Sequence, residues 1–344
     1  MNTTSLLDSI QALDADAERA ARAHLDSLTK PLGALGDLEH IAARLAAIRG
    51  GAPSVDRKSL FIFAADHGVA RRGVSAYPSE VTPQMVLNFL RGGAAANVLA
   101  RQLGASVTVV DVGVDFAFAE LAPLDRKVRR GTRDLCAEDA MTRDECDRAM
   151  SVGMELAKEV DADLLIAGEM GIGNTTSATA IFCALFELDA ADVAGRGTGI
   201  DDAALHRKVE AIEIALARHG ARRDPLDILQ SLGGYEIAAI AGLTLGAAAH
   251  RIPLVVDGFI ATAGVAIAMQ LNPHVRDYLF FGHRSNERAH DIVLRKLNAK
   301  PLLDLGMRLG EGTGALLASH LLEAACRIYR EMATFISAGV SGRS

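Results

Sequence analysis

Short apolar runs recur along the chain, and each is followed by a turn rich in glycine or acidic residues and then by a helical pattern. These runs span 60–65, 107–112, 164–168, 253–257 and 278–282. Continuous apolar runs of this length are typical of parallel strands that are buried on both faces. Strands that alternate with helices require crossover connections, so the chain is predicted to form an α/β fold. We expect an open, doubly wound, mostly parallel sheet with flanking helices.

The helical patterns are of two kinds. Residues 201–218 and, more weakly, 144–159 carry apolar side chains at three- and four-residue spacing between strands. At the two ends of the chain, the stripes from Leu35 to Ile48 and from Leu316 to Ile328 have no strands beside them. The sequence therefore predicts a large α/β domain over residues 55–290. It also predicts a small helical domain formed by both termini, over residues 1–54 and 291–344.

Composition narrows the class of protein. Half of the 344 residues are apolar, and 36 Lys and Arg against 43 Asp and Glu give a net charge of −7. This apolar fraction excludes a wholly disordered chain, and the mild acidity is unlike the basic stripe of a nucleic-acid-binding protein. With no Trp and 4% aromatic residues, a base-stacking surface is also not expected. We predict no nucleic-acid partner.

No membrane or secretory segment is predicted. The most apolar stretch, residues 254–271, is interrupted by Asp257 and is rich in Ala, and the N-terminus lacks the features of a signal peptide. The four cysteines form no CxxC pair and suggest no disulfide framework. We therefore expect a cytoplasmic protein without a membrane partner.

Polar side chains follow most of the predicted strands. Ligands of open parallel sheets bind outside the carboxyl ends of the strands, where these turns lie. Any one of these residues alone is better explained as a helix N-cap, but their recurrence at one edge predicts a site. They are Asp66, His67, Asp111, Glu169, Asp257 and His283.

Glycine-rich loops at residues 168–176, 195–199 and 310–314 each lead into a helix. Glycine lets the backbone approach a ligand closely, and the N–H groups at a helix start favour a phosphate. None of the loops is a Walker motif or a GxGxxG fingerprint. Together they predict a ligand that carries a phosphate or a sugar.

Two glutamates and one lysine are unusual in this setting. Glu169 and Glu311 lie between glycines of these loops, where a carboxylate would repel a phosphate. Such a carboxylate suits ribose hydroxyls, a cationic ligand or a proton to be abstracted, although two solvated loop glutamates are an equal alternative. Lys208 is either a solvated helix residue or a phosphate ligand. The histidines show neither HxxxH nor HxH, so no metal site is expected.

At this point the motifs resemble a known family. GEMGIGNTTSATA (168–180), GRGTGIDD (195–202), DHGV (66–69) with YPSEVTPQMV (77–86), RLGEGTGA (308–315) and LTKPLGALGDLE (28–39) occur in the order found in the nicotinate-nucleotide:dimethylbenzimidazole phosphoribosyltransferase (CobT) family. The resemblance runs from about Leu28 to about Phe335, with Ala65 standing where many members have Gly.

The resemblance implies an activity and a set of partners. The family transfers phosphoribose from β-nicotinate mononucleotide to 5,6-dimethylbenzimidazole with inversion at C1′, which gives α-ribazole 5′-phosphate and nicotinate in cobalamin lower-ligand assembly. It also implies a Rossmann-like, mostly parallel open sheet in a large catalytic domain and a small helical domain from both termini. The expected partners are a second copy of the chain, in a homodimer, and small-molecule substrates, with no cofactor or metal.

The resemblance also assigns residues. Glu311 matches the catalytic base and Glu169 a second active-site acid. The residues that correspond to the nucleotide and phosphate site are Gly171, Gly173, Asn174, Thr175, Lys208, Ser285 and Gly310. Those that correspond to the benzimidazole pocket are Tyr77, Ser79, Gln84 and Leu309.

Other functions stay open at this point. The same fold could use another acceptor, such as adenine or a phenol, which the pocket around residues 77–84 would decide. A non-catalytic nucleotide-binding protein is a second alternative, although the intact Glu169 and Glu311 argue against it. An NAD-dependent oxidoreductase is disfavoured because the dinucleotide fingerprint is missing.

Overall fold

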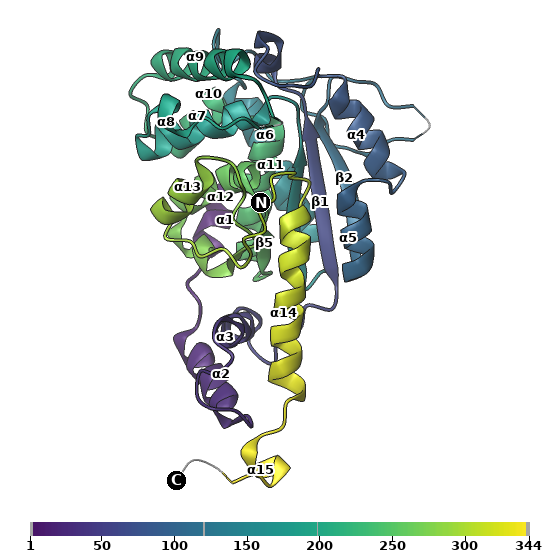
Figure 1. Cartoon of the computed structure of the whole chain (residues 1–344), viewed down its shortest axis with the longest axis vertical. Helices are drawn as coiled ribbons and strands as arrows, with labels where there is room; N and C mark the ends of the chain where they lie inside the picture. Colours follow the sequence, from purple (N-terminus) through teal and green to yellow (C-terminus); the bar gives the residue numbers. More distant parts are fainter. Residues whose placement is uncertain (1–2, 120, 198, 342–344) are drawn as a thin grey trace.

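A single open sheet forms the body of the protein. The computed structural model describes residues 3–119, 121–197 and 199–341 (Figure 1). Six parallel strands lie in the order β3-β2-β1-β4-β5-β6. They are β1 (Lys58–Ala65), β2 (Ala105–Gly113), β3 (Leu124–Asp125), β4 (Leu164–Met170), β5 (Leu254–Val256) and β6 (Leu279–Phe281). This is the strand order of a dinucleotide-binding Rossmann sheet. The chain adds strands outward on one side from β1 to β3 and on the other side from β4 to β6, so the order reverses between β1 and β4.

The predicted fold class and strands are confirmed, each strand to within two residues. The short β3 was not predicted, because two residues are too few to show a hydrophobic pattern. It is an edge strand that pairs with β2 through Val110–Leu124 and Asp111–Asp125.

Helices cover both faces of the sheet. α11 (Tyr235–Ala249) and α12 (Phe259–Leu271) pack on one face, and α6 (Arg143–Glu159) lies behind α11. The other face carries α4 (Val81–Leu90), α5 (Ala95–Leu103) and the upper part of α14 (Thr313–Glu331). The remaining helices are α1 (Thr3–Ser9), α2 (Ala15–Ser27), α3 (Asp37–Arg49), α7 (Asn174–Phe186), α8 (Ala190–Val193), α9 (Asp202–His219), α10 (Pro225–Leu232), α13 (His290–Lys296) and α15 (Phe335–Ala338), with 3-10 turns η1 (Gly68–Arg72) and η2 (Pro273–Tyr278).

Glycines allow α6 and α11 to pack backbone against backbone. A Cβ atom on Gly242 of α11 would lie 1.9 Å from the carbonyl oxygen of Met150. A Cβ atom on Gly153 of α6 would lie 2.0 Å from the carbonyl oxygen of Ala239. The helices therefore approach more closely than any other residue at these positions would permit.

Segments from both terminal parts of the chain lie side by side: Figure 1 shows α2 and α3 beside the lower part of α14, whereas α1 packs against α11. The His24 and Tyr329 rings are 4.4 Å apart between centroids, and Leu28 forms an antiparallel bridge with Thr334. The buried side chains of α3 belong to the same continuous core as those of the sheet. The domain boundaries at residues 55 and 290 stay a prediction. Among the described residues, no helix has the length and apolar character needed to cross a membrane.

Candidate active site

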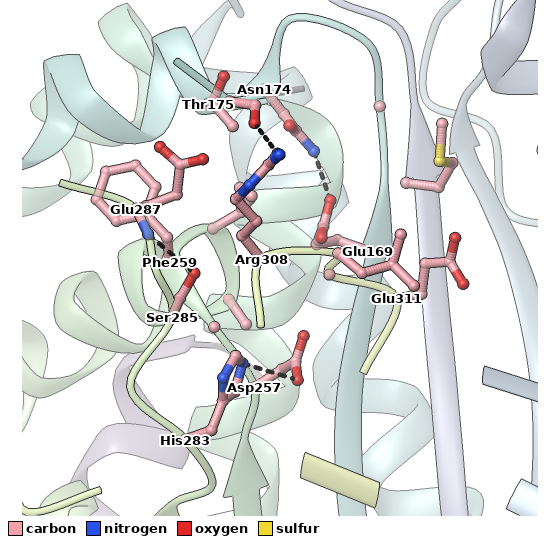
Figure 2. A pocket seen from close by; sticks show the side chains of 18 of the residues that line it. Glu169, Asn174, Thr175, Asp257, Phe259, His283, Ser285, Glu287, Arg308 and Glu311 are labelled. Atoms are coloured by element: carbon pink, nitrogen blue, oxygen red, sulfur yellow. Dashed lines mark hydrogen bonds and ion pairs between the residues drawn. The ribbon is translucent and has the colours of Figure 1, made fainter. Parts of the chain in front are cut away.

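A cavity opens at the carboxyl edge of the sheet, on the side of β4, β5 and β6. It measures about 670 Å³ including its open mouth, and its walls come from the carboxyl ends of β4, β5 and β6 and from the turn before α14 (Figure 2). This is the position at which open α/β sheets bind their ligands. Of the predicted site residues, those that line the cavity are Glu169, Gly171, Asn174, Thr175, Ser285, Leu309, Gly310 and Glu311.

Glu311 lies on a strained turn. Its φ is 62°, between Gly310 at 85° and Gly312 at 82°, so three successive residues adopt the left-handed conformation. Such a conformation in a residue other than glycine costs on the order of 1–3 kcal/mol and is typical of functional sites. The turn sits directly on β4, because a Cβ atom on Gly168 would lie 2.7 Å from the carbonyl oxygen of Glu311.

The carboxylate of Glu311 is buried, and its two oxygens differ in their hydrogen bonding. It accepts a hydrogen bond from the backbone N–H of Ala96 at the start of α5. Its Oε2 has no hydrogen-bond partner within the described part of the chain. Burial and the nearby charge of Asp257 raise the pKa of Glu311 to about 7. A carboxylate with a free oxygen and a pKa near neutrality is suited to accept a proton.

Glu169 connects two of the glycine-rich loops. Its carboxylate accepts hydrogen bonds from Asn174 Nδ2, at 2.5 Å, and from the backbone N–H of Glu311. Burial, Asp257 and Glu236 raise the pKa of Glu169 to about 8. Gly310 leaves room for this contact, since a Cβ atom there would lie 2.2 Å from Glu169 Oε1.

Lys208 connects the loop at residues 195–199 to the first loop. Its side chain is buried on α9, and Nζ donates to Thr175 Oγ1 at 2.9 Å and to the carbonyl oxygen of Gly195 at 3.0 Å. Burial lowers the pKa of Lys208 to about 8, against the opposing effect of Glu287. Lys208 is not on the cavity wall, but Thr175, which it holds, is.

Arg308 was not assigned a role from the sequence, although it begins the RLGEGTGA motif. It lines the cavity and donates from Nη1 to the carbonyl oxygen of Gly197 at 2.7 Å. It also lines an adjoining hollow of about 840 Å³ beside Arg196 and Arg288. An arginine next to the Gly-Glu-Gly turn was the signal that could have identified it.

The polar turn residues divide into two groups. Asp257 and His283 line the cavity. His67 is buried below it, where its ring is hydrogen-bonded to Ser177 Oγ at 3.0 Å and to Glu236 Oε1 at 2.6 Å. Asp111 accepts from the backbone N–H groups of Gly113 and Val114 and pairs with Lys127, so it has a structural role at the end of β2.

The residues predicted for the benzimidazole pocket are only partly brought to this place. Leu309 lines the cavity, whereas Tyr77, Ser79 and Gln84 do not. They lie just before and in α4, which is tied to the first loop by a hydrogen bond from the N–H of Ile172 to Thr82 Oγ1, at 3.1 Å. Their role stays a prediction. Gly173, with φ of 98°, is the N-cap of α7 and is not on the cavity wall.

Comparison with known proteins gives one consistent result. The profile of a family described as phosphoribosyltransferase matches residues 10–340. The nicotinate-nucleotide–dimethylbenzimidazole phosphoribosyltransferase of Geobacter sulfurreducens is 54% identical over 98% of each chain, and that of Chlorobaculum parvum is 51% identical over 98% of each chain. The crystal structure of CobT from Thermus thermophilus superposes with a TM-score of 0.92 at 49% identity, and covers 95% of this chain and 100% of that chain.

These matches extend over nearly the whole chain and include the residues that build the cavity. The predicted family is therefore confirmed. The chain belongs to the nicotinate-nucleotide–dimethylbenzimidazole phosphoribosyltransferase family.

Proposed function

We propose that the protein transfers the phosphoribosyl group of β-nicotinate mononucleotide to 5,6-dimethylbenzimidazole with inversion at C1′. The products are α-ribazole 5′-phosphate and nicotinate. The observation that carries this proposal is the Glu311 carboxylate, buried at the cavity wall with one unpartnered oxygen and a pKa raised to about 7. The names of the relatives support the choice of substrates.

The charges of the substrates define what the protein must supply. The bond from C1′ to the pyridinium nitrogen breaks, and its electron pair stays on that nitrogen, so nicotinate leaves with a neutral ring nitrogen. This leaving group needs no general acid, unlike the oxygen of a sugar ether. The lone pair of the azole nitrogen forms the new bond from the opposite face. The other azole nitrogen then loses its proton, and Glu311 accepts it.

The second acid has a different part in this scheme. Glu169 holds the backbone N–H of Glu311 and the side chain of Asn174, so it fixes both loops around the substrate. When it is ionised, its charge also stabilises positive charge that develops on the ribose. A site with acids close to C1′ and a phosphate cradle farther away suits a substrate that is cationic at one end and anionic at the other.

The phosphate is best accommodated near the start of α7. The N-cap of this 13-residue helix is Gly173, which offers no side chain to cap the first N–H groups. Asn174, Thr175 and Ser285 face the cavity here, and Lys208 lies directly behind Thr175. Helix N–H groups and a nearby ammonium are the usual partners of a phosphate.

The exposure of the residues proposed to bind the benzimidazole is the reason to propose a dimer. Tyr77 is 53% exposed and Leu309 is 57% exposed, although both belong to the proposed benzimidazole pocket. A second copy of the chain that packs over this side would shield these apolar side chains and the azole from water. We therefore propose a homodimer, acting in the cytoplasm on small-molecule substrates.

A product assay tests the proposed reaction. The purified protein is incubated with β-nicotinate mononucleotide and, separately, with dimethylbenzimidazole, benzimidazole, adenine and phenol, and mass spectrometry and NMR report the ribotide and its anomer. An α-ribotide formed fastest with dimethylbenzimidazole supports the proposal. A faster reaction with adenine or phenol would reassign the acceptor, and nucleotide binding without any ribotide would indicate a binding protein.

A further inference from the structure

Asp257 caps a helix that lies far from it in the sequence. It follows β5 and is 1% exposed. Its Oδ2 accepts the N–H of Gly312 at 3.2 Å, and its Oδ1 accepts the N–H of Ala315 at 3.0 Å. α14 has no capping side chain of its own, because its N-cap is Gly312. The carboxylate of Asp257 thus holds the residue that directly follows Glu311.

We propose that Asp257 is a positioning residue of the phosphoribosyl transfer, which fixes Glu311 in its strained turn through the backbone of Gly312 and places a negative charge beside it. The inference rests on the proposed function, in which Glu311 is the base. A residue that only caps α14 would affect stability, whereas Asp257 should affect both the position and the proton affinity of Glu311.

The position of Glu311 depends on this contact. A glutamate with φ of 62° persists only when surrounding groups hold the turn. On one side, Glu169 accepts the N–H of Glu311 itself, and on the other side Asp257 accepts the N–H of Gly312. These bonds to two successive backbone groups come from the ends of two neighbouring strands, β4 and β5. The base is therefore anchored to the rigid sheet.

The charge of Asp257 is felt by both glutamates. It is among the causes that raise the pKa of Glu311 and that of Glu169. Burial raises the pKa of Asp257 above its usual value, and the His283 ring and the N–H groups of Gly258, Gly312 and Ala315 oppose this shift. Both oxygens accept hydrogen bonds from backbone donors, which a protonated carboxyl could do less well. These two contacts suit the carboxylate form of Asp257.

The ring of His283, in the turn after β6, lies beside this carboxylate. Its Nε2 lies 3.6 Å from Asp257 Oδ1, as the dashed line in Figure 2 marks, and the ring is 2% exposed. Glycine at position 314 makes room for the ring, because a Cβ atom there would lie 2.0 Å from His283 Cδ2. The titratable groups that face Asp257 are thus His283, Glu169 and Glu311.

The test is the Asp257→Asn variant, which keeps the volume and removes the charge. One of its two terminal atoms is an NH₂ group, which would face a backbone N–H in place of an acceptor. We expect kcat to fall by up to about 10²-fold, as small misplacements of a catalytic group do, with little change in KM for the nucleotide. The acid limb of the kcat profile should also move to lower pH, because a negative charge beside Glu311 is lost.

A matched control is Asp224→Asn. Asp224 also caps a helix through two backbone N–H groups, those of Leu226 and Asp227 at 2.8 and 3.3 Å, but it lies on the surface away from the cavity. This variant should lower the melting temperature and leave kcat and its pH profile unchanged.

An Asp257→Asn enzyme with the wild-type kcat and an unmoved acid limb would overturn the proposal, even if it melts earlier. If Asp257→Asn does not fold, Asp257→Glu takes its place: it keeps the charge and shifts the carboxylate by one methylene. That variant should show reduced kcat with the acid limb in place, and wild-type kcat would be equally decisive against positioning. Absence of any ribotide from the wild-type protein would instead reject the proposed function, and the role of Asp257 with it.

Discussion

The carboxylate of Glu169 accepts the backbone N–H of Glu311, so one acid of the cavity holds the main chain of the other. The two glutamates are therefore not equivalent. Glu169 is engaged by donors from Glu311 and Asn174, whereas Glu311 keeps one oxygen unpartnered within the described residues. Of these two glutamates, Glu311 is the one with an unpartnered oxygen that can accept a proton from a substrate.

Glu311→Gln should reduce turnover by about 10²–10⁴-fold, which is the usual contribution of a general base. The amide keeps the shape of the carboxylate, and its oxygen can still accept the N–H of Ala96, so the fold should be intact. Initial rates of ribotide formation, together with the circular dichroism spectrum and melting temperature, check this prediction.

The control for that variant is Glu213→Gln, which makes the same change at an exposed position of α9. It should leave turnover unaffected. A Glu311→Gln enzyme that works at nearly the wild-type rate would remove Glu311 from the catalytic role.

The pH dependence of kcat should report the same group. Because the pKa of Glu311 is raised to about 7, its carboxyl is protonated below that pH and cannot accept the azole proton. We expect kcat to rise with pH, to reach half of its maximum near pH 7 and to level off about one pH unit higher. Glu169 interacts with the same turn, so the apparent pKa belongs to the coupled pair. Rates measured at saturating substrate from pH 5 to 9 test this, and a flat profile down to pH 5 would contradict it.

The parts that sequence could predict are local in the chain. The strands and the helices α6, α9, α3 and α14 follow from runs and periodicities that span few residues, and the glycine-rich loops place Glu169 and Glu311 in the site. The bond from Gly312 to Asp257 joins residues 55 positions apart, and no local pattern encodes it. Burial, which moves the pKa of Lys208, is likewise a property of the packed chain.

The residues predicted for the acceptor pocket also show how far sequence alone can place a site. Tyr77, Ser79 and Gln84 were assigned by resemblance alone, and their segment contacts the first loop through Thr82 rather than lining the cavity. Whether residues before α4 face a substrate depends on long-range packing, which no local pattern in the sequence encodes.

Lys208→Met should weaken nucleotide binding and leave azole binding nearly unchanged. Methionine preserves much of the buried aliphatic volume but removes the ammonium that Thr175 and Gly195 hold near the proposed phosphate site.

In the wild-type protein, nucleotide affinity should also fall above pH 8, because the pKa of Lys208 is lowered to about 8 and its charge is lost above that value. Titration calorimetry with each substrate measures both effects, with Lys158→Met, at an exposed position of α6, as the control. Equal losses for the two substrates would contradict a phosphate role.

Gly242→Ala should destabilise the fold without touching the chemistry. The new Cβ atom would lie 1.9 Å from the carbonyl oxygen of Met150, and backbone atoms of α6 cannot move aside as a flexible side chain could. The strain should exceed the gain in helix propensity, with a net loss of about 1–3 kcal/mol, which is typical of overpacked interiors. Chemical denaturation measures this loss, and kcat at low temperature should stay at the wild-type value because neither helix lines the cavity. Gly51→Ala is the control: its Cβ atom meets nothing within 4 Å, so stability should be unchanged. If Gly242→Ala were as stable as Gly51→Ala, the close approach of α6 and α11 would not be a constraint on this core.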